Sequence, residues 1–249
     1  MNNTDKRGTL YLVPNTLGKT PENNTIPAYV LNIIRHIDVF AVENVQQAVR
    51  YLQWVGDTVP DYKITFLQVG KNSPSRDKAD AIRALKEGSD VGLLTDAGLP
   101  AVADPGAEIV NMAHRQGITI VPLVGPSSPM LALMASGLGG QVFAFNGYLP
   151  RDDNKRKDRI KGLERAMVKQ NQTQIFMEAP QRNTAMLKTI LEVCNEETWL
   201  CTAANLTLPN EQILSKSVAD WKQMKELPDL NKKPTIFIIG DPNNIQKQQ

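Results

Sequence analysis

The chain has 249 residues, of which 41% are hydrophobic and 22% are charged. This composition is typical of a globular protein with one or two domains and a sizeable core. No apolar run approaches the ~20 residues of a membrane span, and the N-terminal residues lack the apolar segment of a secretory signal. The formal net charge of +2 does not by itself favour nucleic acid as a partner. We expect a cytoplasmic protein without a membrane partner.

Short β-rich runs alternate with amphipathic segments through the first half of the chain. The predicted strands are Thr9–Val13, Asp38–Val42, Ile64–Val69, Val91–Thr95 and Ile118–Leu123. The segments with helical apolar spacing are Ile26–Ile37, Asn44–Val55, Ser75–Glu87 and Pro105–Gln116. This alternation predicts an open, mainly parallel sheet covered by helices on both faces.

The second half of the chain contains consecutive strands without long crossovers. Its predicted elements are a helix at Ser127–Ser136, a strand at Val142–Phe145, a basic stretch to about Lys169, a strand at Gln174–Met177, a helix at Gln181–Val193, and strands at Trp199–Leu206, Ile213–Ser217 and Thr235–Ile239. Such an order predicts antiparallel or mixed pairing. We therefore expect two α/β domains, residues 1–124 with a mainly parallel sheet and residues 125–249 with a mixed sheet.

Three loops rich in glycine and proline follow predicted strands of the first half. They are Val13–Gly18, Thr95–Gly106 and Val124–Ser128. In an open α/β sheet, ligands bind beyond the carboxyl ends of the strands, near a topological switch point. Glycine permits close backbone approach and proline fixes the path of the chain. Tight turns and a helix cap are the alternative for any single loop, but three such loops at one edge favour a binding site.

Asp96 and Asp104 lie on the second of these loops. A carboxylate pair on such a loop more often makes hydrogen bonds to its own backbone than binds a metal, and no histidine is nearby in the sequence. His36 and His114 lie in predicted amphipathic helices, where a structural or surface role is expected. Cys194 and Cys201 are wrongly spaced for a zinc site and are expected to be buried, reduced thiols. We expect no metal.

Phosphate-binding motifs of the common nucleotide folds do not occur at these loops. No G-x-G-x-x-G follows the first strand, and the chain has no G-x-x-x-x-G-K-[ST]. The dinucleotide and P-loop interpretations therefore lack their phosphate cradle.

The segments TDAGLPAVADPGAEIV, VPLVGPSSPMLALMASGL and FAFNGYLPRDDNKRK resemble the tetrapyrrole (corrin/porphyrin) methylase superfamily. They resemble most closely its branch of bacterial methyltransferases that modify the ribose 2′-hydroxyl of a cytidine in small-subunit ribosomal RNA. LYLVPNTLGK at Leu10–Lys19 and FMEAPQR at Phe176–Arg182 also match that branch. The resemblance covers nearly the whole chain, from Leu10 to about Gly240.

The resemblance implies a methyltransferase that uses S-adenosylmethionine, held in a cleft between two α/β domains. It also implies a homodimer that acts in rRNA processing on ribosomal RNA or the small ribosomal subunit. Carried onto this chain, the cofactor contacts are Thr16, Ala97, Gly98, Leu99, Val102, Ser127, Ser128, Met177, Ala204 and Leu206.

A hydroxyl acceptor must lose its proton, so a positioned general base would assist methyl transfer. Glu43 follows the second predicted strand and Glu178 follows the strand Gln174–Met177. Both are candidate catalytic residues, with a solvated or helix-capping role as the alternative for each.

The stretch Arg151–Arg165 holds seven basic and four acidic side chains, a net charge of +3. On an RNA-modifying enzyme it would contact phosphates. A solvated helix face explains the same residues equally well.

This chain departs from the RNA-methylating branch where contacts with the substrate are expected. Glu43-Asn44-Val45-Gln46 replaces Glu-Asp-Thr-Arg, and Ala-Ala-Asn-Leu-Thr-Leu at 203–208 replaces Ala-Arg-Glu-Leu-Thr-Lys. Neutral residues therefore stand in place of charged ones at Asn44, Gln46, Ala204, Asn205 and Leu208.

Two other functions therefore remain open beside methylation of ribosomal RNA. One is C-methylation of a porphyrin or corrin precursor, whose carboxylates would need arginines such as Arg151, Arg156 and Arg182. The other is a homologue that binds the cofactor or RNA without turnover, which the neutral residues at Ala204 and Asn205 suggest.

Overall fold

The computed structural model of the protein describes residues 7–18, 25–56, 60, 63–70 and 75–243. The chain forms two units, Met1–Ser127 and Ser128–Gln249, each with a five-stranded sheet. The sequence predicts a division after residue 124, three residues before the boundary between these units. The first residues, on which the expected absence of a secretory signal depends, lie partly outside the described ranges.

The sheet of the first unit is parallel at every described pairing. Its strands are β1 (Thr9–Val13), β2 (Val39–Val42), β3 (Thr65–Gln68), β4 (Val91–Leu94) and β5 (Thr119–Pro122). Their order in the sheet is β3-β2-β4-β1-β5, with β4 at the centre and buried throughout. This agrees with the mainly parallel sheet that the alternation of strands and helices predicts.

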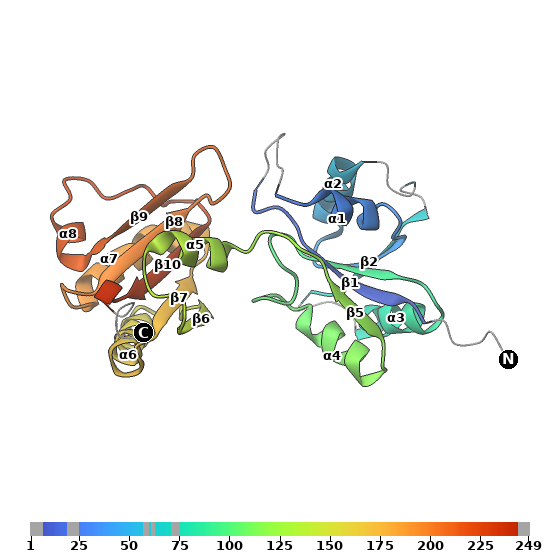
Figure 1. Cartoon of the computed structure of the whole chain (residues 1–249), viewed down its shortest axis with the longest axis horizontal. Helices are drawn as coiled ribbons and strands as arrows, with labels where there is room; N and C mark the ends of the chain where they lie inside the picture. Colours follow the sequence, from blue (N-terminus) through green and yellow to red (C-terminus); the bar gives the residue numbers. More distant parts are fainter. Residues whose placement is uncertain (1–6, 19–24, 57–59, 61–62, 71–74, 244–249) are drawn as a thin grey trace. The chain divides into compact units, whose positions relative to one another are not determined.

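Helices cover both faces of this sheet (Figure 1). Helices α1 (Ala28–Ile34) and α2 (Val45–Val55) pack on one face, in a core that includes Phe40 and Leu94. Helices α3 (Ser75–Lys86) and α4 (Ala107–Arg115) pack on the other. A parallel strand buried on both faces explains why β4 reads Val-Gly-Leu-Leu without alternation.

The first helix is shorter than the predicted Ile26–Ile37. Pro27 precedes it with an extended ψ of 146°, so the chain enters the helical conformation only at Ala28. At its end, His36 and Ile37 donate to carbonyls three residues back, at 3.1 and 3.2 Å. These tighter bonds end the α-helix at Ile34.

The second unit has a mixed sheet, as predicted. Its strands are β6 (Phe143–Tyr148), β7 (Thr173–Met177), β8 (Trp199–Ala204), β9 (Gln212–Ser217) and β10 (Thr235–Gly240). The order is β6-β7-β10-β8-β9. β6 and β7 are parallel, whereas β10 is antiparallel to both of its neighbours and β9 is antiparallel to β8.

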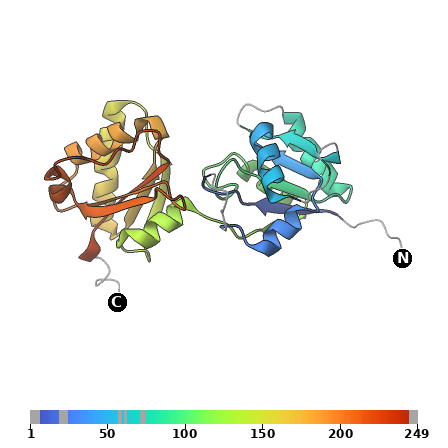
Figure 2. The ribbon, with the colours of Figure 1, turned by 90° about the horizontal axis from the view of Figure 1, so that it is seen from above.

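Helices lie on both faces of this sheet as well (Figure 2). Helix α5 (Ser128–Ser136) lies on one face, and α6 (Asp153–Gln170) and α7 (Asn183–Val193) lie on the other. A short 3₁₀ turn, η2 (Pro180–Arg182), precedes α7. The core between the sheet and α6 and α7 contains the stacked pair Phe176 and Phe237, with ring centroids 5.9 Å apart.

Helix α8 (Val218–Lys222) is not predicted by the sequence pattern, because it is only five residues long. Ser217 caps it by accepting a hydrogen bond from the backbone N–H of Asp220 at 3.1 Å. The helix positions Trp221, which is fully buried and donates its indole N–H to the carbonyl of Leu200 at 2.9 Å.

Both cysteines are free and buried, and burial raises the pKa of each thiol to about 12. Neither is therefore a nucleophile near neutral pH. None of the described helices is both long and apolar enough to cross a bilayer.

The contrast between two tryptophans tests the core of the second unit. Trp221→Ala should lower the free energy of unfolding by roughly 3–5 kcal/mol, because it removes a large buried ring. Trp54→Ala in the first unit should cost clearly less, because that side chain is 38% exposed. Urea unfolding followed by circular dichroism measures both, and equal losses would contradict the assignment of Trp221 to the core.

Candidate functional site

The candidate site in the first unit lies at the topological switch point of the parallel sheet, between β1 and β4. β1 and β4 are neighbours, but the chain leaves β1 toward α1 on one face and leaves β4 toward α4 on the other (Figure 1). The loops that follow these two strands therefore diverge at the carboxyl edge of the sheet. This is the place at which open α/β sheets bind ligands.

Asn15, the second residue after β1, joins the first two loops. Its backbone N–H donates to the carbonyl of Gly98 at 2.8 Å, and the N–H of Gly98 donates back at 3.2 Å. Its side-chain amide donates to the carbonyls of Thr95 and Asp96 at 3.0 and 3.2 Å. Its side-chain oxygen accepts from the N–H of Thr16 at 2.8 Å. The glycine and proline pattern of the loops does not predict a role for Asn15, although its position directly after Val-Pro in the first loop is a signal.

Glycine lets the third loop approach the first. A Cβ built on Gly125 would lie 2.2 Å from the Cβ of Pro14, so no larger residue fits there. A Cβ on Gly98 would lie 3.6 Å from the carbonyl oxygen of Pro126, which precedes Ser127. The structure thus brings together the three loops that carry Thr16, Gly98 and Ser127.

The second loop contains three residues in the left-handed conformation. Their φ values are 71° at Gly98, 64° at Ala101 and 56° at Ala103. Alanine pays roughly 1–2 kcal/mol for this conformation, so the surrounding bonds must hold the loop in place.

Asp104 accepts several of the hydrogen bonds that hold the second loop. This agrees with the expectation that its carboxylate bonds to the backbone of its own loop. Its carboxylate accepts from the N–H of Gly106 at 2.6 Å, from the N–H of Ala101 at 3.3 Å and from the hydroxyl of Thr95 at 2.7 Å. Asp96 braces the loop differently from the expected backbone bond. Its carboxylate accepts from the side-chain amide of Gln47 on α2, at 3.0 Å.

Glu43, directly after β2, is half-buried beside these two aspartates. Burial, the negative charges of Asp104 and Asp96, and the hydrogen bond between Glu43 and Asp104 raise the pKa of Glu43 from 4.5 to about 7. Burial and the charge of Asp104 also raise the pKa of Asp96. A carboxyl group with a pKa near 7 is present in both protonation states at neutral pH, and it can therefore accept a proton from a bound hydroxyl.

The other candidate cofactor contacts of the first unit differ in their exposure to solvent. Ala97 and Val102 are exposed, whereas Thr16, Leu99 and Ser127 are half-buried. The part of the chain that the structure describes contains no group of three or more histidine, cysteine, aspartate or glutamate side chains arranged to hold a metal ion.

In the second unit, Met177 and Ala204 end β7 and β8 at the same edge of the sheet. They pair with Ile236 and Thr235 at the start of β10, which runs between these two strands. Met177 is half-buried and Ala204 is buried. Ser128 begins α5 and is half-buried.

The chain after β8 follows an unusual path. Asn205 and Thr207 have φ values of 52° and 70°. Asn205 and Leu206 are both 6% exposed, and the N–H of Asn205 donates to the carbonyl of Pro234 at 2.9 Å. Leu208 donates its N–H back to the carbonyl of Asn205 at 3.0 Å, which closes a turn. Neutral residues fit these buried positions without a charge partner.

Glu178 is held inside the second unit. Its side chain is 1% exposed, and one carboxylate oxygen accepts from the N–H of Ala179 at 2.6 Å and pairs with Arg182. The other oxygen is buried and has no hydrogen-bond partner. This environment favours a structural role, because water and a substrate hydroxyl do not reach a carboxylate that is buried in this way.

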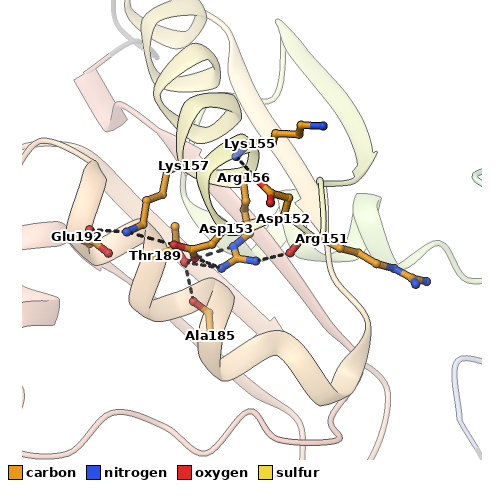
Figure 3. Close-up of polar contacts among 9 residues, drawn as sticks. All are labelled: Arg151, Asp152, Asp153, Lys155, Arg156, Lys157, Ala185, Thr189 and Glu192. Atoms are coloured by element: carbon orange, nitrogen blue, oxygen red, sulfur yellow. Dashed lines mark hydrogen bonds and ion pairs between the residues drawn. The ribbon is translucent and has the colours of Figure 1, made fainter.

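The basic stretch Arg151–Arg165 lies mostly on α6, and the structure separates its cations into two groups. Arg156 is buried and donates to Thr189 and to the carbonyl of Arg151, and it pairs with Asp153 (Figure 3). Lys157 lies between Asp153 and Glu192, at 3.3 and 2.8 Å. These two residues hold α6 in place, whereas Arg151 and Lys155 are exposed.

Comparison with known proteins identifies relatives along almost the whole chain. The family described as Tetrapyrrole (Corrin/Porphyrin) Methylases matches residues 21–221. "Ribosomal RNA small subunit methyltransferase I" of Buchnera aphidicola subsp. Schizaphis graminum is 30% identical, over 97% of this chain and 81% of its own length. The protein of the same name from Bacillus subtilis (strain 168) is 32% identical, over 88% of this chain and 70% of its own length.

A solved structure shares the fold. "Uroporphyrin-III C-methyl transferase from Thermus thermophilus complexed with S-adenyl homocysteine" superposes with a TM-score of 0.55 at 16% identity, over 96% of this chain and 100% of that chain. These comparisons confirm the resemblance that the loop motifs suggest, the two-sheet α/β fold and the expectation of a methyltransferase. The chain belongs to the tetrapyrrole methylase family.

Proposed function

We propose that this protein is a cytoplasmic methyltransferase that transfers a methyl group from S-adenosylmethionine to a ribose 2′-hydroxyl in small-subunit ribosomal RNA. The observation that carries this proposal is the name shared by relatives 30% and 32% identical to it. The motifs that resemble the 2′-hydroxyl-methylating branch support the choice of acceptor atom.

The loops of the first unit fit the proposed cofactor. S-adenosylmethionine combines a cationic sulfonium, an ammonium and a carboxylate with a hydroxylated ribose and an adenine that has apolar faces. Asp96 offers negative charge at the edge of the sheet, and Ala97 and Val102 offer exposed apolar surface beside it. Thr16, Gly98, Leu99 and Ser127 complete the candidate contacts of this unit, and Ser128, Met177, Ala204 and Leu206 are those of the second.

The chemistry requires little covalent participation by the protein. The sulfonium, when bound, supplies an already activated methyl group, so the residues must align the acceptor, exclude water and remove one proton. Glu43 suits the last task because its pKa of about 7 lets it take the hydroxyl proton at neutral pH. Glu178 suits it less, because its carboxylate is buried and paired with Arg182.

C-methylation of a porphyrin or corrin precursor is the second candidate, and the shared fold with a uroporphyrin-III methyltransferase favours it. Such a substrate carries several carboxylates. Of the three arginines expected to bind them, Arg156 is buried in its network with Thr189 and Arg182 is paired with Glu178. Only Arg151 remains exposed without such a partner among the described residues, so the geometry favours RNA.

Labelled methyl transfer separates these functions from each other and from a homologue without turnover. The purified protein is incubated with methyl-labelled S-adenosylmethionine and one of two acceptors. These are small ribosomal subunits from a strain that lacks the gene for this protein, and a uroporphyrinogen. Label in a 2′-O-methylnucleoside is the expected result. Label only in the macrocycle would establish C-methylation, and label in neither would favour the homologue without turnover.

The pH dependence of methyl transfer tests Glu43. The rate should rise as the pH increases through about 7, because the ionised form accepts the proton. Glu43→Gln should lower kcat roughly 100-fold or more and leave the affinity for S-adenosylmethionine unchanged. Asp104→Asn should move the midpoint of the pH profile to lower pH, because Asp104 carries the negative charge that raises the pKa of Glu43 most. A pH profile that survives Glu43→Gln and disappears in Glu178→Gln would instead assign the base to Glu178.

Unfolding provides a second readout of Glu43. Its pKa in the folded state lies above the ordinary value of 4.5, so the folded protein holds this proton more tightly than the unfolded chain. This contribution to stability is therefore complete below pH 4.5 and is lost as the pH rises to about 7. The loss should be about 1 kcal/mol after solvent screening of this half-buried group, and it should be absent in Glu43→Gln.

Two glycines of matched conformation test the cofactor loop. Gly98 and Gly137 have φ values of 71° and 69°, so alanine at either position should cost roughly 1–2 kcal/mol of stability. Only Gly98→Ala should weaken the binding of S-adenosylmethionine, because Gly137 lies after α5 rather than on the candidate loops. Calorimetric titration measures both affinities. Equal affinities in the two folded variants would exclude this loop from the cofactor site.

The proposal includes a homodimer. Apolar side chains that stay exposed in the second unit support it, among them Met134 at 79% and Met130 at 36% on one side of α5. Sedimentation equilibrium at micromolar concentration should give twice the 27.6 kDa chain mass. A monomer under these conditions would count against the dimer.

A further inference from the structure

We propose that Tyr148, Arg151, Lys155 and Arg159 form a surface that binds single-stranded RNA, with the ring of Tyr148 stacked on an unpaired base. The inference rests on the proposed function and deepens it, because it names the part of the second unit that would recognise the acceptor strand. These four residues are called the RNA surface below.

Tyr148 lies at the carboxyl end of β6, an edge strand of its sheet. Its side chain is 61% exposed, although it directly precedes the buried Leu149. Gly147, with a φ of 61°, and a shift of register between Phe145 and Tyr148 interrupt the regular strand here. The interruption ends with Tyr148 paired to Met177 on β7. The exposed ring therefore lies one strand away from a candidate cofactor residue.

Arg159 connects helix α6 with this end of β6. Its guanidinium donates to the side-chain oxygen of Asn146 at 2.8 Å, two residues before Tyr148. Asn146 is itself fixed, because its amide donates to the side-chain oxygen of Gln174 at 3.1 Å and to the carbonyl of Ala144 at 3.2 Å. Arg159 is exposed and uses one of its N–H groups in this bond, so its other donors are available to an anion.

Arg151 and Lys155 extend the cationic surface from Arg159 to the start of α6. Figure 3 shows both side chains pointing away from the network around Arg156. Within the described residues neither side chain makes a hydrogen bond or an ion pair. Lys155 and Arg159 are four residues apart, which places them on the same side of the helix.

The nearby acidic residues do not cancel this charge. Asp153 is paired with Arg156 and Lys157, and Asp152 caps the helix by accepting from the backbone N–H of Lys155 at 2.9 Å. Asp152 and Asp158 are both exposed and negatively charged, but they are two carboxylates against three cations. The buried Arg156 therefore lowers the negative charge at the start of α6, because it neutralises Asp153.

An aromatic ring beside several unpaired cations matches the chemistry of a single RNA strand. Arginine and lysine bind the phosphates, and an exposed aromatic ring stacks on any of the four bases. A 2′-hydroxyl acceptor in an unpaired segment would then be held by its neighbouring base and phosphates. A folded protein partner would require a larger apolar area than one tyrosine provides.

Two matched pairs of variants test the RNA surface. Tyr148→Ala removes the ring, whereas Tyr148→Phe retains it. Arg151→Gln with Lys155→Gln removes two charges from the surface. Lys161→Gln with Lys169→Gln removes the same charge from exposed positions elsewhere on α6, and Lys161 points away from Arg159 because it is about 200° further around the helix.

Binding of a fluorescein-labelled single-stranded RNA is measured by anisotropy over a series of salt concentrations. Tyr148→Ala should weaken binding roughly tenfold and Tyr148→Phe should bind like the wild type. The Arg151/Lys155 variant should reduce the slope of log affinity against log salt by about 1.4, or about 0.7 for each lost phosphate contact, and the Lys161/Lys169 variant should reduce it less. The affinity for S-adenosylmethionine should stay at the wild-type value in all four variants.

The same proteins then enter the methyl-transfer assay with small ribosomal subunits. The KM for subunits should rise in Tyr148→Ala and in the Arg151/Lys155 variant. If the wild type labels subunits but all variants bind RNA and turn over alike, the inference is wrong and the proposed function stands. If the expected binding pattern appears but no subunit is labelled, the proposed function fails and the RNA surface stands. A change of sedimentation in Tyr148→Ala with unchanged RNA binding would assign the ring to a contact between subunits and overturn the inference.

Discussion

The candidate site of the first unit depends on one buried side chain, Asn15. Its amide group donates to two carbonyls of the second loop and accepts from the backbone of its own loop, while its main chain pairs with Gly98. An aspartate would lose the donors and a leucine would leave the carbonyls unpaired in a buried place, at a cost of about 1–3 kcal/mol for each group. Without this side chain, the carbonyls of Thr95 and Asp96 would lose the donor that ties the start of the second loop to the first loop.

A rigid loop has an electrostatic consequence. Asp104 accepts hydrogen bonds from Thr95 and Gly106, and Asp96 accepts one from Gln47, so these bonds hold both carboxylates near Glu43. Burial of Glu43 raises its pKa most, and repulsion from these two carboxylates, which mobile side chains would relieve, raises it further. The bonds that brace the backbone therefore also contribute to the raised pKa of Glu43, the residue proposed as the general base.

Periodicity predicted the sheets and most helices, because both depend on buried apolar residues that the sequence displays directly. β1 (Thr9–Val13) has the predicted bounds, whereas α8 was missed because its position depends on the cap by Ser217 and on the burial of Trp221, which are tertiary contacts. Within the site, glycine and proline predicted the three loops. They did not predict Asn15, the bond from Gln47 to Asp96, or the division of the basic stretch into buried and exposed cations, since the partners lie 33 to 81 residues apart.

The order of the strands in the second unit also has a consequence for its synthesis. β10 lies between β7 and β8, so without it the sheet consists of two separate pairs, β6 with β7 and β8 with β9. Residues 235–240 are the last of these strands to leave the ribosome. Until they emerge, the buried edges of β7 and β8 are open to pairing with other chains. The sheet of the first unit, in contrast, is complete once Pro122 has been made, so the two halves of this protein do not face the risk of aggregation for the same length of time.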